Sequence, residues 1–293
     1  MPATDRAQDR AMSRPRLGVV KFASCDGCQL TLLDLEDELL PITDRVEIVE
    51  FAEATSARSS GPYDLLLVEG SISTPEQAHE IVELRRQTAK LVTIGACATA
   101  GGIQALRNVA DHDAWRAAIY PEPAWIESLA TATPIADHVT VDAELRGCPI
   151  APGQLKEFLV ASLVGRRPQL PDEAVCMECK RAGRVCVVVA SGEACLGPVT
   201  RTGCGALCPA YARGCYACFG PRESANVAGL RQGFVAASLL TEAEVDERFA
   251  GFTAMAPAFA PSASAAALSY REGAVVRPST DKAARPEVDD ARR

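Results

Sequence analysis

The sequence predicts an α/β fold, in which a doubly wound parallel sheet precedes a smaller, irregular domain that covalent or coordinate bonds must hold together. Between residues 17 and 164, short β-branched apolar runs alternate with segments of helical periodicity, which is the pattern of βαβ units. Between residues 176 and 218, one segment with few long apolar runs holds eight of the chain's 12 cysteines. Such a short segment buries little apolar surface, so covalent or coordinate bonds must stabilise it.

Five strands and three helices make up the predicted sheet domain. Each expected strand is an apolar run bounded by turn-forming residues, and the runs cover residues 16–23, 45–52, 63–70, 90–96 and 138–141. The expected helices cover residues 30–40, 74–84 and 155–164. We expect Pro41 to end the first helix, whereas Pro75 occupies the first turn of the second, where its missing N–H costs nothing.

Four cysteines directly follow predicted strands, although they are far apart in the chain. Cys25 and Cys28 follow the first strand, Cys97 follows the fourth, and Cys148 follows the fifth. Because the carboxyl ends of parallel strands share the edge at which open α/β sheets bind ligands, we expect these thiols to converge. A lone cysteine would be interpreted as buried and inert, but four that meet at one edge indicate a metal centre.

Three kinds of bonding could use the eight thiols of residues 176–218. The first 16 residues contain no apolar stretch typical of a secretory signal, so we do not expect the oxidising compartment that disulfides need. Structural zinc could pair Cys176 and Cys179 with Cys215 and Cys218. That pairing leaves four irregularly spaced cysteines, and irregular spacing suits iron–sulfur clusters better. We therefore favour clusters and keep zinc as the alternative.

Composition narrows the possible partners. Hydrophobic residues make up 48% of the chain and charged residues 23%, as in globular proteins. The net charge is −8, which argues against a nucleic-acid partner because phosphate binding needs a basic face. No stretch approaches 18 consecutive apolar residues, so we expect no membrane span.

The chain divides into four predicted parts. Residues 1–16 are polar and lack periodicity, so we expect a disordered leader. Residues 17–165 form the sheet domain, and residues 166–256 form the cysteine-rich domain, which begins with a proline-containing linker and ends with two helices. Residues 257–293, rich in Ala, Pro and Ser and then in charge, are expected to be a disordered tail.

Several motifs, taken in order, resemble the small, electron-transferring subunit of [NiFe] hydrogenases. The matching stretches are SCDGC at 24–28, VEG at 68–70, GACATAGG at 95–102, GCPI at 147–150, CLGP at 195–198 and CYAC at 215–218. A single CxxC is commonplace, but the ordered set is specific and covers roughly residues 17–250. The resemblance implies a flavodoxin-like sheet domain holding a proximal [4Fe-4S] cluster, with the ligands Cys25, Cys28, Cys97 and Cys148. It also implies a medial and a distal cluster in the second domain.

The chain departs from the periplasmic members of that family. Those members carry a twin-arginine signal, a His ligand at the place of Cys176, and a proline in place of a fourth medial cysteine, and they often end in a membrane anchor. The resemblance then implies a distal [4Fe-4S] cluster on Cys176, Cys179, Cys186 and Cys195 and a medial one on Cys204, Cys208, Cys215 and Cys218. The three histidines, His79, His112 and His138, lie outside the cluster segment and are not expected to be ligands.

The all-cysteine pattern resembles cytosolic hydrogenases of the NAD(P)-linked or sulfhydrogenase delta-subunit type. The resemblance implies a cytoplasmic subunit with no catalytic residue of its own, which carries electrons between a large subunit's nickel–iron centre and partner subunits that bind FAD and NAD(P). We expect neither a nucleic-acid nor a membrane partner. Glu69, after the third strand, is expected either to shape the surroundings of the proximal cluster or to be a solvated loop carboxylate.

Three alternatives to this function remain open. The carrier could be a deazaflavin or a ferredoxin rather than NAD(P). The chain could instead be a cluster subunit like that of respiratory complex I, although that subunit has adjacent cysteines where Cys25 and Cys28 are spaced by two residues, and it lacks an eight-cysteine domain. The non-enzymatic alternative is a scaffold protein stabilised by zinc.

Overall fold

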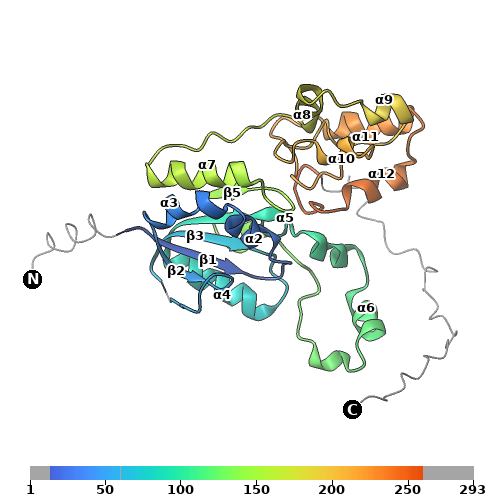
Figure 1. Ribbon diagram of the computed structural model, residues 1–293. Helices are drawn as coiled ribbons and strands as arrows, with labels where there is room; N and C mark the ends of the chain where they lie inside the picture. The colour runs from blue at the N-terminus through green and yellow to red at the C-terminus, as the bar shows by residue number, and fades with distance from the viewer. Residues whose placement is uncertain (1–13, 60, 260–293) are drawn as a thin grey trace, which may run out of the picture.

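The computed structural model describes residues 14–59 and 61–259. The predicted leader and tail therefore lie outside the described residues, apart from residues 14–16 and 257–259. Within the described part, an α/β sheet domain is followed by a cysteine-rich region of short helices and loops (Figure 1). This arrangement confirms the fold class predicted from the sequence.

The sheet has five strands, all parallel, in the order β2-β1-β3-β4-β5. The strands are β1 (Arg16–Lys21), β2 (Glu47–Phe51), β3 (Tyr63–Glu69), β4 (Thr88–Ile94) and β5 (Ala143–Leu145). This order is that of flavodoxin-like sheets, and the chain reverses direction across the sheet between β1 and β3. Residues of β3 and β4 are buried on both faces of the sheet, which explains why these strands are continuous apolar runs in the sequence.

Helices cover both faces of the sheet. The helices α2 (Gly27–Leu33), α3 (Leu40–Thr43) and α7 (Pro152–Leu163) pack on one face, and α4 (Pro75–Arg86) packs on the other. The start of α4 is fixed by Thr74 and Gln77, whose side chains each accept a backbone N–H of the other's residue. Pro75 lies in the first turn, as its position in the sequence predicted.

Two predicted elements are wrong in detail. The fifth strand lies at Ala143–Leu145 rather than 138–141, because Asp142 is the first residue whose backbone bonds to β4, through Leu91. The predicted helix over residues 30–40 breaks after Leu33, since Glu36 takes a left-handed conformation with a φ of 47°. Pro41 accordingly begins α3 instead of ending a longer helix.

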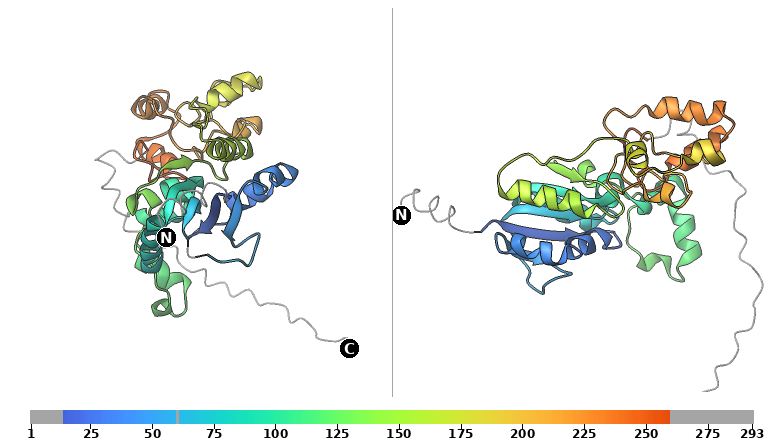
Figure 2. Two further views of the ribbon diagram at one scale, coloured as in Figure 1. Left: turned by 90° about the vertical axis from the view of Figure 1, so that its left-hand side faces the viewer. Right: turned by 45° about the horizontal axis from the view of Figure 1, so that its top comes forward.

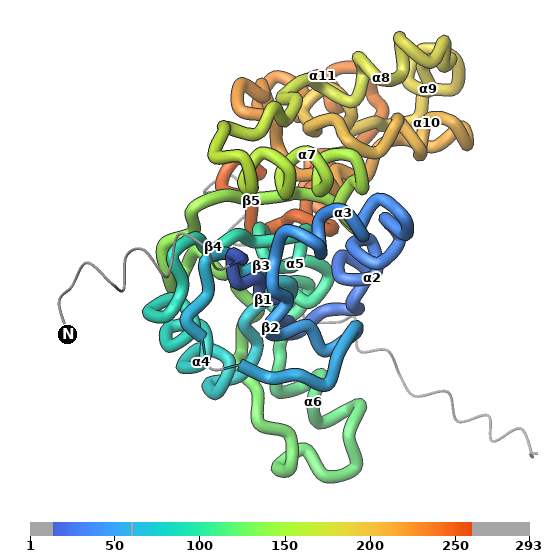
Figure 3. The backbone as a smooth tube through the Cα atoms, turned by 60° about the vertical axis from the view of Figure 1, so that its left-hand side comes forward, coloured from blue at the N-terminus to red at the C-terminus, as the bar shows by residue number. Residues whose placement is uncertain are grey.

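Two further helices of the first domain were not expected from the sequence. The helix α5 (Gly95–Ala100) directly follows β4 and packs against the sheet. The helix α6 (His112–Ile119) belongs to an arm that extends away from the sheet (Figure 3). The arm bears exposed aromatic side chains. Because these side chains pack into no core, the apolar pattern of the sequence did not predict the helix.

The second domain consists of five helices joined by long loops. They are α8 (Val175–Arg181), α9 (Val187–Ser191), α10 (Leu207–Ala210), α11 (Val227–Ala236) and α12 (Glu242–Phe249). The two helices expected after Cys218 are confirmed as α11 and α12. The core of this domain combines apolar side chains with two buried cysteines, Cys195 and Cys215. Phe259, the last described residue, is buried there and contacts the ring of Phe249 edge-on.

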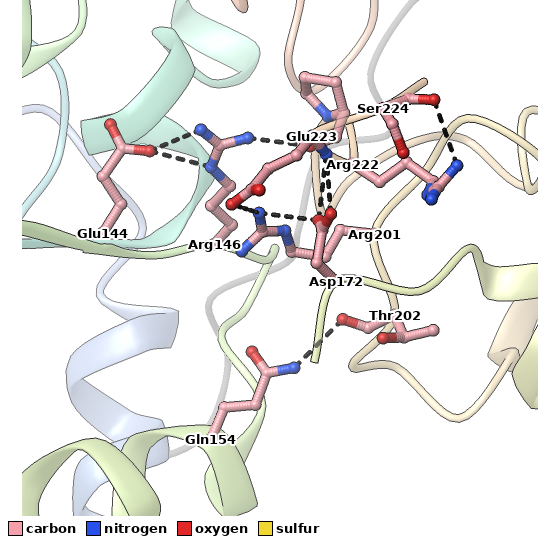
Figure 4. A network of polar contacts seen from close by, with 10 residues as sticks. Glu144, Arg146, Gln154, Asp172, Arg201, Thr202, Arg222, Glu223 and Ser224 are labelled. Atoms are coloured by element: carbon pink, nitrogen blue, oxygen red, sulfur yellow. Dashed lines mark hydrogen bonds and ion pairs between the residues drawn. The ribbon is translucent and has the colours of Figure 1, made fainter. Parts of the chain in front are cut away.

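A network of polar contacts joins the two domains (Figure 4). Arg146, just after β5, donates a hydrogen bond of 3.0 Å to the carbonyl oxygen of Pro221, and its guanidinium also binds Glu144. Gln154 of α7 donates to the carbonyl oxygen of Thr202 over 3.1 Å. These contacts fix the β5–α7 loop, which carries Cys148, against the cysteine-rich domain.

Candidate iron–sulfur sites

The first group of thiols, which we call the sheet-edge thiols, lies at the carboxyl ends of the strands, as predicted. Its members are Cys25, Cys28, Cys97 and Cys148. Cys25 precedes α2 and Cys28 lies within it, Cys97 lies on α5, and Cys148 lies in the β5–α7 loop. Burial raises the pKa of Cys97 to about 11, and the neighbouring thiols of Cys148 and Cys25 contribute to the rise. The structure therefore brings together thiols from three separate parts of the chain.

Glycine lets the backbone approach these sulfurs closely. Gly95 has a φ of +87°, and a β-carbon at this position would lie 2.4 Å from the Sγ atom of Cys28. A β-carbon on Gly102 would lie 2.5 Å from the Sγ atom of Cys97. A side chain at either position would collide with a cysteine sulfur, so glycine is needed where the backbone passes these thiols.

Glu69 lies beneath the sheet-edge thiols and is only 2% exposed. Its carboxylate oxygens accept the backbone N–H groups of Cys28 at 3.2 Å and Gln29 at 3.3 Å. Burial raises the pKa of Glu69, and these backbone hydrogen bonds oppose the rise. The alternative of a solvated loop carboxylate is therefore wrong: Glu69 is a buried side chain that holds the first turn of α2, where Cys28 lies.

The second group, the cavity thiols, lines a single cavity of about 250 Å³ between the cysteine-rich domain and the β5–α7 loop. Its members are Cys204, Cys208, Cys215 and Cys218. The wall also includes Cys148 of the sheet-edge thiols and the ring of Phe219. Burial raises the pKa of Cys218 to about 12, with Cys204 as the next cause. Five thiols therefore line one apolar-walled cavity, and thiolates are the ligands that iron–sulfur clusters use.

The third group, the outer thiols, comprises Cys176, Cys179, Cys186 and Cys195. Burial raises the pKa of Cys176 to about 11, and Cys195, Cys179 and Cys186 contribute to the rise in that order. Cys176 and Cys179 lie on α8, whereas Cys186 immediately precedes α9. Cys186 is exposed and Cys195 is buried, so this group extends from the domain core to the surface.

The three groups lie in series. The backbone N–H of Cys215, a cavity thiol, donates to the Sγ atom of Cys195, an outer thiol, over 3.2 Å. On the other side, Cys148 of the sheet-edge thiols lines the same cavity as Cys218 and the other cavity thiols. The sequence showed neither link, because both join residues that only the folded loops bring together.

Two of the three histidines lie beside hydroxyl groups of the sheet domain. His112 lies 3.0 Å from the hydroxyl of Ser128, and His138 lies 2.8 Å from the hydroxyl of Thr133.

Among the residues that the structure describes, no three His, Cys, Asp or Glu side chains are arranged to share a single metal ion. The described helices also include none that is long and apolar enough to cross a bilayer.

Comparison with known proteins places these features in a family. A family model described as "NADH ubiquinone oxidoreductase, 20 Kd subunit" matches residues 25–162. The delta subunit of sulfhydrogenase 2 from Pyrococcus furiosus is 35% identical over 237 residues, which cover 81% of this chain and 98% of the relative. A subunit of the vhu F420-non-reducing hydrogenase from Methanococcus voltae is 30% identical over 71% of this chain and 83% of its own length.

One solved structure is similar over a smaller part. The crystal structure of an NAD+-reducing [NiFe]-hydrogenase in the H2-reduced state contains a chain with 27% identity and a TM-score of 0.50. The match covers 54% of this chain but 96% of that chain. It therefore extends over little more than half of the present sequence, whereas the P. furiosus relative matches four fifths of it.

The fold and the thiol groups define an iron–sulfur, electron-transferring protein built on a flavodoxin-like sheet. The chain belongs to the small-subunit family of [NiFe] hydrogenases. It is a subunit of a hydrogenase complex that also contains a large subunit. The family model named after the complex I subunit covers the sheet domain alone, and the relatives that also match the cysteine-rich domain are hydrogenase subunits.

Proposed function

We propose that this chain relays electrons through three [4Fe-4S] clusters between the nickel–iron site of the large subunit and an NAD(P)-reducing flavoprotein partner. The sheet-edge thiols would hold the proximal cluster, the cavity thiols the medial cluster and the outer thiols the distal cluster. The observation that carries the proposal is the serial arrangement of the groups. Cys148 and Cys218 line one cavity on one side, and Cys215 is hydrogen-bonded to Cys195 on the other.

The chemistry requires such a relay. Splitting one hydrogen molecule releases two protons and two electrons, whereas a cubane cluster accepts one electron at a time. Cysteines alone supply the proposed ligands, and thiolate ligation gives lower potentials than histidine ligation does. We therefore expect three low and similar potentials, which suit reversible exchange with a low-potential carrier such as NAD(P)H.

The contact with the large subunit is proposed at the sheet edge. Cys25 and Cys148 are both exposed in the isolated chain, so a partner must cover them if the proximal cluster is to be shielded from water. The large subunit must approach here, since the proximal cluster receives its electrons. We also propose that the complex is cytoplasmic, because its proposed carrier NAD(P) and the flavoprotein that reduces it are cytoplasmic.

A second candidate keeps the relay but replaces the carrier. The NAD+-reducing hydrogenase chain matches only 54% of this chain, whereas the relative from the F420-non-reducing hydrogenase matches 71%. That difference is the observation behind the second candidate, in which a carrier such as a ferredoxin takes the place of the NAD(P)-reducing flavoprotein. The number of clusters and their ligands would be the same in both cases.

The test uses the hydrogenase complex purified without oxygen. The relay predicts about 12 iron and 12 sulfide ions in this chain, because three clusters hold four of each. Stoichiometric zinc with little iron would refute it. Hydrogen-dependent reduction of NAD+ or NADP+ supports the first candidate, and reduction of ferredoxin without any nicotinamide reduction supports the second. Redox titration of the three clusters should find the medial potential close to the other two.

A further inference from the structure

The outer end of the cysteine-rich domain exposes apolar side chains that no described residue covers. The helices α8, α9 and α10 lie together at this end in both views of Figure 2 and in Figure 3. Val189 on α9 is 86% exposed and Tyr211 after α10 is 74% exposed. The full set of exposed large apolar residues here is Met177, Val185, Val189, Leu207 and Tyr211.

This end is basic, although the chain as a whole is acidic. The chain has a net charge of −8, yet residues 176–218 contain five Lys and Arg residues against two Glu residues. Lys180, Arg184 and Arg213 are exposed, and none of them forms an ion pair with another described residue. These three basic residues, which we call the basic rim, lie on the same short helices and loops as the exposed apolar residues.

The acidic residues nearest to this end do not neutralise it. Glu178 turns its carboxylate into the domain, where it accepts the backbone N–H groups of Gly203 at 2.8 Å and Ala206 at 3.1 Å. Glu173 is paired with Arg181. The positive charge of Lys180, Arg184 and Arg213 is thus available to a partner.

The single exposed thiol of the eight in the cysteine-rich domain lies within this surface. It is Cys186, which Val185 precedes and from which α9 begins. The surrounding residues 180–186 are all exposed. The outer thiols consequently reach the protein surface at the point where apolar and basic side chains are gathered.

We propose that this surface, the exit face, docks an acidic redox protein that carries its own flavin or iron–sulfur centre near its surface. The inference rests on the proposed relay, because it uses the outer thiols as the point where electrons leave. Each hydrogen molecule that the complex oxidises supplies two electrons, so two single-electron acceptors are reduced in turn. The apolar centre allows close approach of the two cofactors, and the basic rim orients an acidic partner.

Charge complementarity of this kind acts on the rate of association. It raises association rates by about 10- to 1000-fold at low salt and loses its effect as salt screens the charges. The partner's reduction should therefore depend strongly on salt, while electron flow inside the hydrogenase should not.

The experiment uses the complex of the full-length chain with its large subunit, and an acidic two-cluster ferredoxin as the probe. The test variant is Lys180→Glu/Arg184→Glu. The matched control is Arg45→Glu/Arg58→Glu, which makes the same charge change at exposed positions of the sheet domain. A second test variant, Val189→Asp, removes the most exposed apolar side chain of the exit face. Hydrogen-dependent reduction of methyl viologen and of ferredoxin is measured for each at low and high salt.

We expect Lys180→Glu/Arg184→Glu to lower kcat/KM for ferredoxin about tenfold at ~50 mM salt and less than twofold at ~0.5 M salt. Val189→Asp should lower it at both salt concentrations. Iron content and methyl viologen reduction should stay within twofold of the unmodified complex for all variants. A control that slows ferredoxin as much as the test variant would overturn the exit face.

Two other outcomes would assign the surface to a different occupant and overturn the proposal. If Lys180→Glu/Arg184→Glu no longer co-elutes with the large subunit, the surface belongs to that subunit. If it changes the number of copies of the complex in solution, the surface joins two copies of this chain. Failure of the relay itself is recognised separately, because the unmodified complex would then reduce neither methyl viologen nor ferredoxin with hydrogen.

Discussion

Replacing Gly95 by alanine tests the proposed proximal cluster most directly. The left-handed backbone at this position costs an alanine about 1–2 kcal/mol. The new β-carbon would lie 2.4 Å from the Sγ atom of Cys28, and such overpacking typically costs about 1–3 kcal/mol. The sum of about 2–5 kcal/mol corresponds to a loss of roughly 30-fold to several thousand-fold in the equilibrium for holding the cluster.

The assay counts iron and sulfide per chain in the complex and records the EPR spectrum of the reduced protein. We expect Gly95→Ala to lose about four of 12 iron ions and the signal of one cluster, since Cys28 cannot move aside and remain a ligand. The control is Gly233→Ala in α11, where an added β-carbon meets no atom within 4 Å. The control should keep all its iron and gain up to about 1 kcal/mol in stability.

The reasoning would be refuted by a Gly95→Ala protein with full iron content and unchanged spectra. That result would mean that the Sγ atom of Cys28 has room to retreat, and that the close approach of the backbone is not needed. Equal iron loss in Gly233→Ala would show instead that the method reports general instability.

Two further substitutions test the medial site and the joint between the domains. Cys208→Ala removes one of the four proposed medial ligands, so the oxidised complex should show a three-iron EPR signal that the unmodified complex lacks. An unchanged spectrum would remove Cys208 from the ligand set. Arg146→Met loses the hydrogen bond to Pro221 and should lower the free energy of unfolding by about 1–3 kcal/mol. Calorimetry should show this as a lower unfolding temperature, and EPR should show altered coupling between the proximal and medial clusters. Arg86→Met, at an exposed ion pair, should change stability by less than about 0.5 kcal/mol, and equal effects of the two arginines would contradict the role of the joint.

The order of the elements could be predicted from the sequence because buried parallel strands are continuous apolar runs. The runs that became β1, β3 and β4 are of this kind, and they placed Cys25 and Cys97 correctly at the sheet edge. The fifth strand was displaced because a three-residue edge strand carries too little periodicity to locate. Cys148 still follows it, since the glycine and proline around that residue mark a loop wherever the strand ends.

The side-chain environments could not be predicted, because they depend on contacts between distant segments. Glu69 ends a strand and resembles a loop carboxylate in sequence, yet the fold places α2 over it and buries it. Arg146 has no sequence signal at all, since its partner Pro221 is 75 residues away. The position of Cys148 in the wall of the cavity thiols' cavity likewise became visible only in the folded chain.

The different exposure of the thiols has a consequence for the order in which oxygen damages them. Cys25, Cys148 and Cys186 are exposed at the two ends of the series, whereas Cys215 at its middle is 4% exposed. Dissolved oxygen meets the ends first, and the large subunit covers only one of them in the proposed complex. Oxidative damage should then progress inward from the uncovered end, so the protein would lose contact with its carrier while the centre of the chain remained intact.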